Sequence, residues 1–206
     1  MADQGHDGAG APLFEADLLQ EILGSALRTG GEFAEVFVED RRSTSAILDD
    51  GRVEELTSGR DRGAGIRVVV GETTGFAHTA DVTPAGLHSA AAAAAAAARS
   101  GGGGVSEVVL SPGDGPSPAV VEVFPGDVPK LRKVALVQEA DAAARGEGGA
   151  ITQVTVRYGD SERRIQVANS DGLLVGDRQI RTMFSVSCVA TGDTGMQTGR
   201  ESVGHT

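Results

Sequence analysis

The sequence predicts an α+β fold in which two units, each a helix followed by an antiparallel meander, form one domain with mixed α/β layers. Apolar and polar residues alternate over 34–80 and again over 151–190, which is typical of half-buried strands. Glycine-containing turn sequences separate these runs, and Asp50-Gly51 supplies the positive φ that a tight hairpin requires. Apolar residues at three- and four-residue spacing precede each set of strands and predict amphipathic helices.

The first half of the domain is assigned to residues 12–99, after a polar tail at 1–11 that we expect to be disordered. An apolar face over 13–27 predicts a helix at 12–28, and Gly30-Gly31 ends it.

Strands are predicted across 33–80, with turns at Asp50-Gly51, Gly63-Ala64-Gly65 and Gly71-Glu72. Thr83, as a capping residue followed by proline, then begins a helix that runs through an alanine stretch to Arg99. The alanines would let this helix lie close against another surface, although a tolerant position that has drifted towards alanine explains them equally well.

A flexible linker is expected at 100–118, because it contains four consecutive glycines and several prolines. The second half, 119–206, contains a short apolar run at 120–124 that suggests an edge strand. A helix is predicted at 129–145, with Leu131, Val134, Ala135, Val137 (or Leu136), Ala140 and Ala144 on its buried side. The strands that follow are expected at 151–158, 164–169, 173–180 and 183–190, with turns at 159–160 and 169–172 and a last strand from about Met196.

One stretch resembles a known family. The segment GAGIRVVVGETTGFA at 63–77, preceded by a strand ending in Asp50-Gly51 and followed by an Asp81-to-Leu87 lead into a helix, is similar to the N-terminal domain of the TldD/PmbA family. That family has been called modulators of DNA gyrase and is regarded as zinc metalloproteases. The similarity continues more weakly from 129 to 204. It implies a peptidase whose subunits form a homodimer or heterodimer around a channel, with zinc bound in the full-length protein.

The metal motif of such a protease, H-E-x-x-x-H on a helix, is absent from this chain. The segment Arg200 to His205 copies it except that arginine replaces the first histidine, and arginine cannot coordinate zinc. We therefore assign no catalytic residue, no metal ligand and no cofactor to this chain, and expect it to be inactive alone. Because the chain stops at Gly-His-Thr without a cap or turn, we interpret it as a truncation that lacks the C-terminal metal domain.

Other candidates for chemistry are weak. Cys188 lies in an apolar alternating run, where a buried structural thiol is the simplest role. Asp49-Asp50 and Glu54-Glu55 flank a hairpin turn, where acidic residues are ordinary.

The composition restricts partners and location. Eighteen basic residues against 29 acidic ones give a net charge of −11, which disfavours nucleic acid. A single cysteine precludes an intrachain disulfide and fits a reducing compartment. No stretch is apolar enough for a membrane span or a signal peptide, so we expect a cytoplasmic protein.

Peptide binding is the function that these exclusions leave for this chain. An extended peptide can pair with an exposed strand edge, and the strand at 73–79 is the candidate, with Gly75, Phe76 and His78 as the peptide-binding residues. An ordinary core strand with one exposed histidine is the competing interpretation. The leading hypothesis is therefore a substrate-admission and dimerisation domain of a TldD-like zinc metalloprotease that acts on unfolded or modified peptides. The alternatives are a stand-alone peptide-binding or regulatory protein and a non-catalytic partner subunit.

Overall fold

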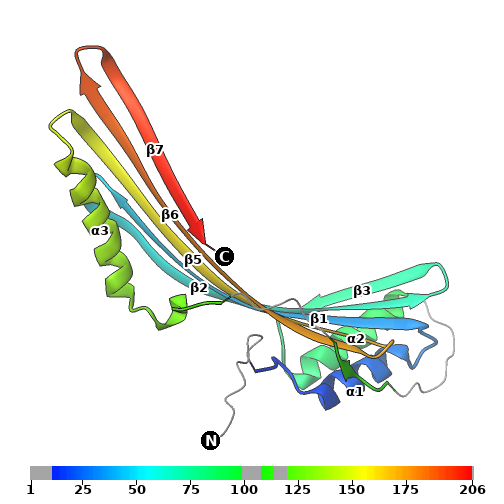
Figure 1. The fold of residues 1–206 in the computed structure, drawn as a ribbon. Coiled ribbons are helices and arrows are strands. Elements are labelled where there is room, and N and C mark those ends of the chain that lie inside the picture. Colours follow the sequence, from blue (N-terminus) through cyan, green and yellow to red (C-terminus); the bar gives the residue numbers. More distant parts are fainter. Residues whose placement is uncertain (1–10, 99–107, 114–119, 206) are drawn as a thin grey trace, which may run out of the picture. The chain divides into compact units, whose positions relative to one another are not determined.

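The computed structural model describes residues 11–98, 108–113 and 120–205, and these residues form the predicted α+β fold (Figure 1). The elements are α1 (Ala16–Leu27), β1 (Phe33–Asp49), β2 (Arg52–Val70), β3 (Thr73–Thr79), α2 (Pro84–Ala97), β4 (Ser111–Pro112), a 3₁₀ turn (Pro125–Asp127), α3 (Lys130–Gly146), β5 (Ile151–Asn169), β6 (Leu173–Gly192) and β7 (Gly195–His205). The strands form one sheet in the order β3-β2-β1-β5-β6-β4, and β7 also pairs with β6. The β2–β3 and β6–β7 pairs are antiparallel, whereas the two-residue β4 runs parallel to β6.

The chain divides into two compact units that do not follow the expected halves 12–99 and 119–206. The first unit comprises Met1–Arg41, Asp61–Pro118 and Arg163–Arg178, and the second comprises Arg42–Arg60, Ala119–Glu162 and Gln179–Thr206. The reason is the length of β1, β2, β5 and β6, each of which contributes residues to both units. Each compact unit therefore contains residues from both halves of the sequence.

In the first unit, α1 and α2 cover one face of the sheet. Val36 of β1 and Ile66 of β2, both even-numbered, are fully buried in a core with Leu19, Leu23 and Leu87 from the helices. Thr83 caps α2 as predicted, because its Oγ1 accepts a hydrogen bond from the Gly86 amide at 3.2 Å.

The first helix is shorter than the predicted 12–28, because its first residues bind elsewhere. The Phe14 amide donates to Gln166 Oε1 at 2.8 Å, and Gln166 Nε2 donates back to the Phe14 carbonyl at 3.0 Å. This pair of bonds holds the Phe14 backbone against β5, so that α1 begins only at Ala16.

The alanine run of α2 packs directly on β3. A Cβ atom at Gly75 would lie 2.0 Å from the Ala94 carbonyl oxygen and 2.4 Å from the Ala98 amide nitrogen. The backbones of α2 and β3 therefore touch where glycine lies against alanine, because neither residue type has a large side chain. This agrees with the interpretation of the alanines as small residues at a close helix contact.

In the second unit, α3 packs on β1 and β5 through Val137, which meets Leu48 and Val156 in a small apolar core. The prediction of Leu131 on the buried side was wrong, because this side chain is 82% exposed. Lys133 is buried instead.

The buried Lys133 forms an ion pair. Its Nζ lies 2.6 Å from Asp160 Oδ2 and 5.7 Å from the centre of the Tyr158 ring. Both charged side chains are almost fully buried. Burial, followed by the hydrogen bond to Asp160, strongly raises the pKa of the Tyr158 hydroxyl, so the phenol remains protonated.

Two predicted turns are absent because their glycines lie inside strands. Residues 63–65 belong to β2, and the turn expected at 159–160 lies within β5, where Asp160 pairs with Lys133. The hairpin at Asp50-Gly51 is confirmed, with φ of 46° and 78°, and Gly71 also has a positive φ of 54°. The last strand near Met196 is confirmed as β7.

The segments around the expected linker differ from the prediction. Residues 108–113 are held in place: Val108 and Leu110 are buried, and β4 pairs with β6. Residues 120–124 form no strand, and Val120 is exposed. The expected tail up to residue 10 and the rest of the linker, 100–107 and 114–118, lie outside the described residues.

The contact between Gly75 and α2 gives a first testable prediction. Gly75→Ala should lower the free energy of unfolding by about 2 kcal/mol, because the new methyl group meets backbone atoms that cannot rotate away. Gly159→Ala is the matched control in another strand, since no atom in the described part of the chain lies within 4 Å of its added Cβ. Urea unfolding followed by circular dichroism measures both, and equal midpoints for the two variants would contradict the close contact.

The buried ion pair gives a second prediction. Lys133→Met should lower the free energy of unfolding by about 3 kcal/mol, because it leaves the Asp160 carboxylate buried without its cationic partner. Arg132, the residue before Lys133, forms an exposed ion pair with Glu139. Arg132→Met removes this pair and should lower the free energy of unfolding by less than about 1 kcal/mol. The same denaturation experiment distinguishes the two, and a Lys133→Met variant as stable as Arg132→Met would show that the pair does not hold α3.

Candidate functional site: the β3 edge and its hollow

β3 is the terminal strand of the sheet beside β2, and its register determines which backbone groups are free. Val70 pairs with Thr73 across the two-residue loop 71–72, so these two residues exchange both hydrogen bonds of the hairpin. The odd-numbered residues of β3 therefore point their amide and carbonyl groups towards β2. The Val69 carbonyl accepts from Glu32, as this alternation requires.

The even-numbered residues Thr74, Phe76 and His78 consequently turn their backbone groups away from the sheet. All three residues are exposed, and no described strand pairs with them on that side. The edge thus offers unpaired backbone donors and acceptors at every second residue.

The side chains of Phe76 and His78 lie on the open face, by which we mean the face of the first unit's sheet opposite α1 and α2. Their rings stack with centres 6.3 Å apart. The Phe76 ring also leans over Gly65 of β2, where an added Cβ would lie 3.1 Å from the ring. Glycine at 65 therefore makes room for an aromatic ring, which explains why it lies inside a strand.

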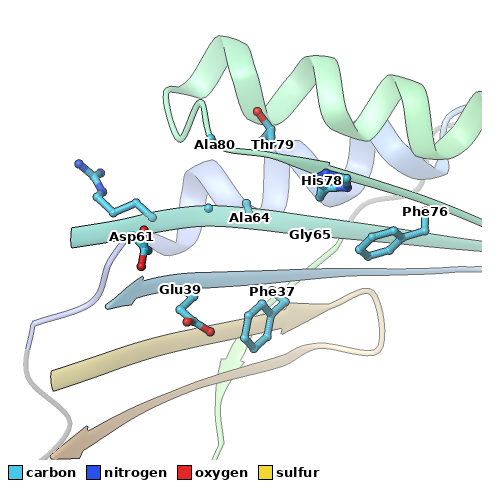
Figure 2. A pocket seen from close by; sticks show the side chains of 11 residues that line it. Phe37, Glu39, Asp61, Ala64, Gly65, Phe76, His78, Thr79 and Ala80 are labelled. Carbon is cyan, nitrogen blue, oxygen red and sulfur yellow. The ribbon is translucent and has the colours of Figure 1, made fainter. Parts of the chain in front are cut away.

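A hollow of about 400 Å³ occupies this part of the open face. Figure 2 shows the carboxyl groups of Glu39 and Asp61 at one end and the rings of Phe37 and Phe76 further along. The complete lining is Phe37, Glu39, Asp61, Arg62, Gly63, Ala64, Gly65, Phe76, His78, Thr79 and Ala80. This volume suits a side chain or small ligand.

The structure brings together two of the three predicted peptide-binding residues. Phe76 and His78 share the open face and line the hollow. Gly75 does not line it, because this residue is buried on the opposite face beneath α2. Sequence reasoning missed Phe37, Glu39 and Asp61, although their odd positions in β1 and β2 placed them opposite the core residues.

The acidic pairs at the hairpin are bound into the sheet of the second unit. Asp49 Oδ1 accepts from Thr155 at 2.6 Å and from Gln153 at 3.3 Å, and these bonds lower the pKa of Asp49. Hydrogen bonds from Ser45 and then Thr57 likewise lower the pKa of Glu55. Carboxylates held ionised in this way are poor proton donors at neutral pH, which favours the ordinary hairpin role.

The described residues do not fit a catalytic metal. Among residues 11–98, 108–113 and 120–205, no three His, Cys, Asp or Glu side chains are grouped to hold an ion. Arg200 and His205 lie in β7, where residues five apart point to opposite faces. Cys188 is a free, partly buried thiol that packs against the core of the second unit.

None of the helices in the described part of the chain is long and apolar enough to cross a membrane.

Comparison with known proteins identifies two consecutive metallopeptidase domains. The PmbA/TldA metallopeptidase domain 1 matches residues 34–98, and the PmbA/TldA metallopeptidase central domain matches 124–205. The chain therefore belongs to the TldD/PmbA family.

Curated relatives agree with this assignment. A metalloprotease of Methanothermobacter thermautotrophicus is 31% identical over 175 residues, which is 85% of this chain and 38% of the relative. A TldD metalloprotease homologue of Haemophilus influenzae is 35% identical over 60 residues, covering 29% of this chain and 12% of that protein.

Solved structures share the fold at low sequence identity. TldE from Thermococcus kodakarensis matches with a TM-score of 0.74 and 16% identity, over 91% of this chain and 42% of that one. A protein of Bacteroides thetaiotaomicron described as a candidate modulator of DNA gyrase matches with a TM-score of 0.71 and 17% identity, over 91% and 44%. The chain thus spans about two fifths of the relatives that it matches along most of its length.

The hydrogen bonds to Asp49 give a third prediction. Thr155→Val should raise the pKa of the Asp49 carboxyl towards its ordinary value, because it removes the largest cause of the lowering. A lowered folded-state pKa stabilises the fold above the unfolded-state pKa, and this stabilisation disappears as pH falls through the folded-state value. The variant should therefore lose less stability on acidification below about pH 4 than the wild type.

Titration of the carboxyl carbons by NMR measures this pKa directly. Thr152→Val is the control on the same strand, since the Thr152 hydroxyl donates to the Val189 carbonyl and to no carboxylate in the described structure. An Asp49 pKa that is the same in all three proteins would refute the assignment.

Proposed function

We propose that this chain is the N-terminal substrate-admission and dimerisation part of a TldD-like zinc metalloprotease that acts on unfolded or modified peptides. Membership of the family and the metallopeptidase names of its domains support this proposal. The described residues do not fit a zinc site, so in this proposal the metal and the hydrolytic step belong to the remainder of a longer protein. The role of this chain is to hold the peptide.

The free edge of β3 is the observation that carries the proposal. Unpaired groups of Thr74, Phe76 and His78 can form a ladder with the backbone of an extended chain. Such bonding requires an unfolded segment but little particular sequence, which suits a protease that processes many peptides. An exposed strand edge can also pair with other chains and cause aggregation, so an uncovered edge is most readily explained by a binding function.

The proposed assembly is a homodimer, or a heterodimer with a second TldD/PmbA-type subunit, in the cytoplasm. A dimer would enclose the bound peptide, and a reducing compartment suits the free thiol of Cys188. Nucleic acid is not a partner in this proposal, because the net charge of −11 opposes phosphate binding.

A pair of substitutions at His78 tests the edge. His78→Pro removes an outward amide donor without removing a β2–β3 bond, and His78→Ala removes the ring but keeps the donor. His78→Pro should bind two unrelated extended peptides about tenfold more weakly than His78→Ala, by a similar factor for each. Fluorescence anisotropy with the 206-residue chain measures both affinities.

Unchanged thermal midpoints in both variants establish that the fold is intact. The proposal fails if His78→Ala weakens binding as much as His78→Pro does, because the ring would then be the ligand-binding group. It also fails if the wild-type chain binds neither peptide.

A further inference from the structure

The hollow beside the β3 edge has an excess of negative charge at one end. Glu39 lines the hollow, and its Oε2 accepts hydrogen bonds from Arg163 Nε at 2.9 Å and from Arg163 Nη2 at 2.5 Å. Asp61 has no ion-pair or hydrogen-bond partner among the described residues. Glu39 is thus paired with the Arg163 guanidinium, whereas Asp61 is unpaired in the described structure.

The second nearby arginine does not correct the imbalance. Arg62 is even-numbered, and its Nε lies 3.9 Å from Asp40, whose side chain is buried on the helical face. Arg62 also lines the hollow, but its guanidinium is shared with the Asp40 carboxylate, so the negative groups around this end still outnumber the positive ones. Figure 2 agrees, since the Asp61 carboxyl lies on the same side of the sheet as Glu39 and Phe37.

The rest of the hollow is apolar and aromatic. Phe37, the stacked pair Phe76 and His78, and the glycines Gly63 and Gly65 line it. The faces of aromatic rings attract cations. A lysine or arginine combines an apolar stem with a terminal cation and so matches both ends of the hollow.

The distance from the edge to the carboxylates selects for long side chains. A peptide paired with β3 lies one strand spacing outside it, whereas Asp61 is on β2 and Glu39 is on β1. Because the β2–β3 pairing ends at Ala64 and Thr79, the bound side chain must reach past the end of β3, over roughly two spacings of about 4.8 Å each. Because successive side chains of the peptide alternate between faces, only every second residue can reach the hollow.

We propose that this hollow binds the side chain of a lysine or arginine in a peptide held at the β3 edge, which makes the preferred substrates extended peptides with a basic residue. The inference rests on the proposed function, since the edge must hold the peptide backbone. It adds a selectivity that backbone pairing alone does not provide. Asp61 is the main determinant, because it is the carboxylate without a partner in the described structure.

The test uses a nine-residue threonine-serine host peptide, capped at both ends, with a single guest residue at its centre. The guests are arginine, citrulline, which has nearly the same shape without the charge, and leucine. The wild-type chain should bind the arginine peptide about fivefold more tightly than the citrulline peptide, as expected for an exposed charge pair assisted by aromatic faces. Leucine should bind no better than citrulline.

Asp61→Asn should reduce the preference for arginine to less than about twofold and leave the citrulline peptide unaffected. Glu21→Gln is the matched control, because Glu21 is an exposed carboxylate on α1, on the helical side of the sheet, and its loss changes the net charge equally. This control should keep the preference of the wild type. Compared with His78→Ala, which also lacks the ring, His78→Pro should weaken the binding of all three peptides by a similar factor.

Each result separates the two proposals. Equal binding of arginine and citrulline peptides by the wild type overturns the basic-residue site but leaves the edge intact. If the leucine peptide binds more tightly than the citrulline peptide, the hollow is an apolar site and the basic-residue site is overturned. A loss of preference in Glu21→Gln as large as that in Asp61→Asn also overturns it, because net charge alone would then explain the effect. If none of the peptides binds to the wild type, the proposed function fails as well.

Discussion

The alternation of side chains along β1, β2 and β5 is the constraint on which the rest of the structure depends. Within each unit, even-numbered residues of β1, such as Val36 in the first and Leu48 in the second, face the helices and the core. A shift of one residue in strand register would turn this set to the solvent, at a cost of about 2 kcal/mol for each large side chain. The register is therefore fixed, and it fixes the odd-numbered residues, including Phe37 and Glu39, on the other face.

The close contact between α2 and β3 determines how the terminal strand is held. A terminal strand is bonded to one neighbour only, and here the helix adds a second contact through the buried Gly75 backbone. β3 is thus anchored from beneath, and its outer edge does not need a further strand. The glycine and the alanines of α2 thereby serve the proposed peptide edge indirectly, because they position Phe76 and His78 without touching a ligand.

Charged groups in this acidic chain are used in three different environments. Lys133 and Asp160 are paired in the interior of the second unit, where removal of either would leave an uncompensated charge. Asp49 is tied to the sheet by hydroxyl and amide donors that keep it ionised. Asp61 has neither kind of partner among the described residues and lines a hollow that aromatic rings also line, which is why it is the acidic residue to which we assign a ligand.

Local chemistry determined much of this fold from the sequence alone. The Thr83 cap, the positive φ of Asp50-Gly51 and the period-two alternation depend on neighbouring residues, and the structure confirms each. The family resemblance in residues 63–77 was also recognisable from the sequence.

Tertiary structure alone decided where the glycines and buried charges belong. In a sequence, a glycine is compatible with a turn or with the close approach of another group to the backbone. Only the position of the Phe76 ring on the neighbouring strand shows that Gly65 has the second role. Likewise, Lys133 is buried because Asp160, 27 residues away, neutralises it, whereas periodicity predicted Leu131. The hollow itself requires three strands in register, and pairing between distant residues leaves no local signal in the sequence.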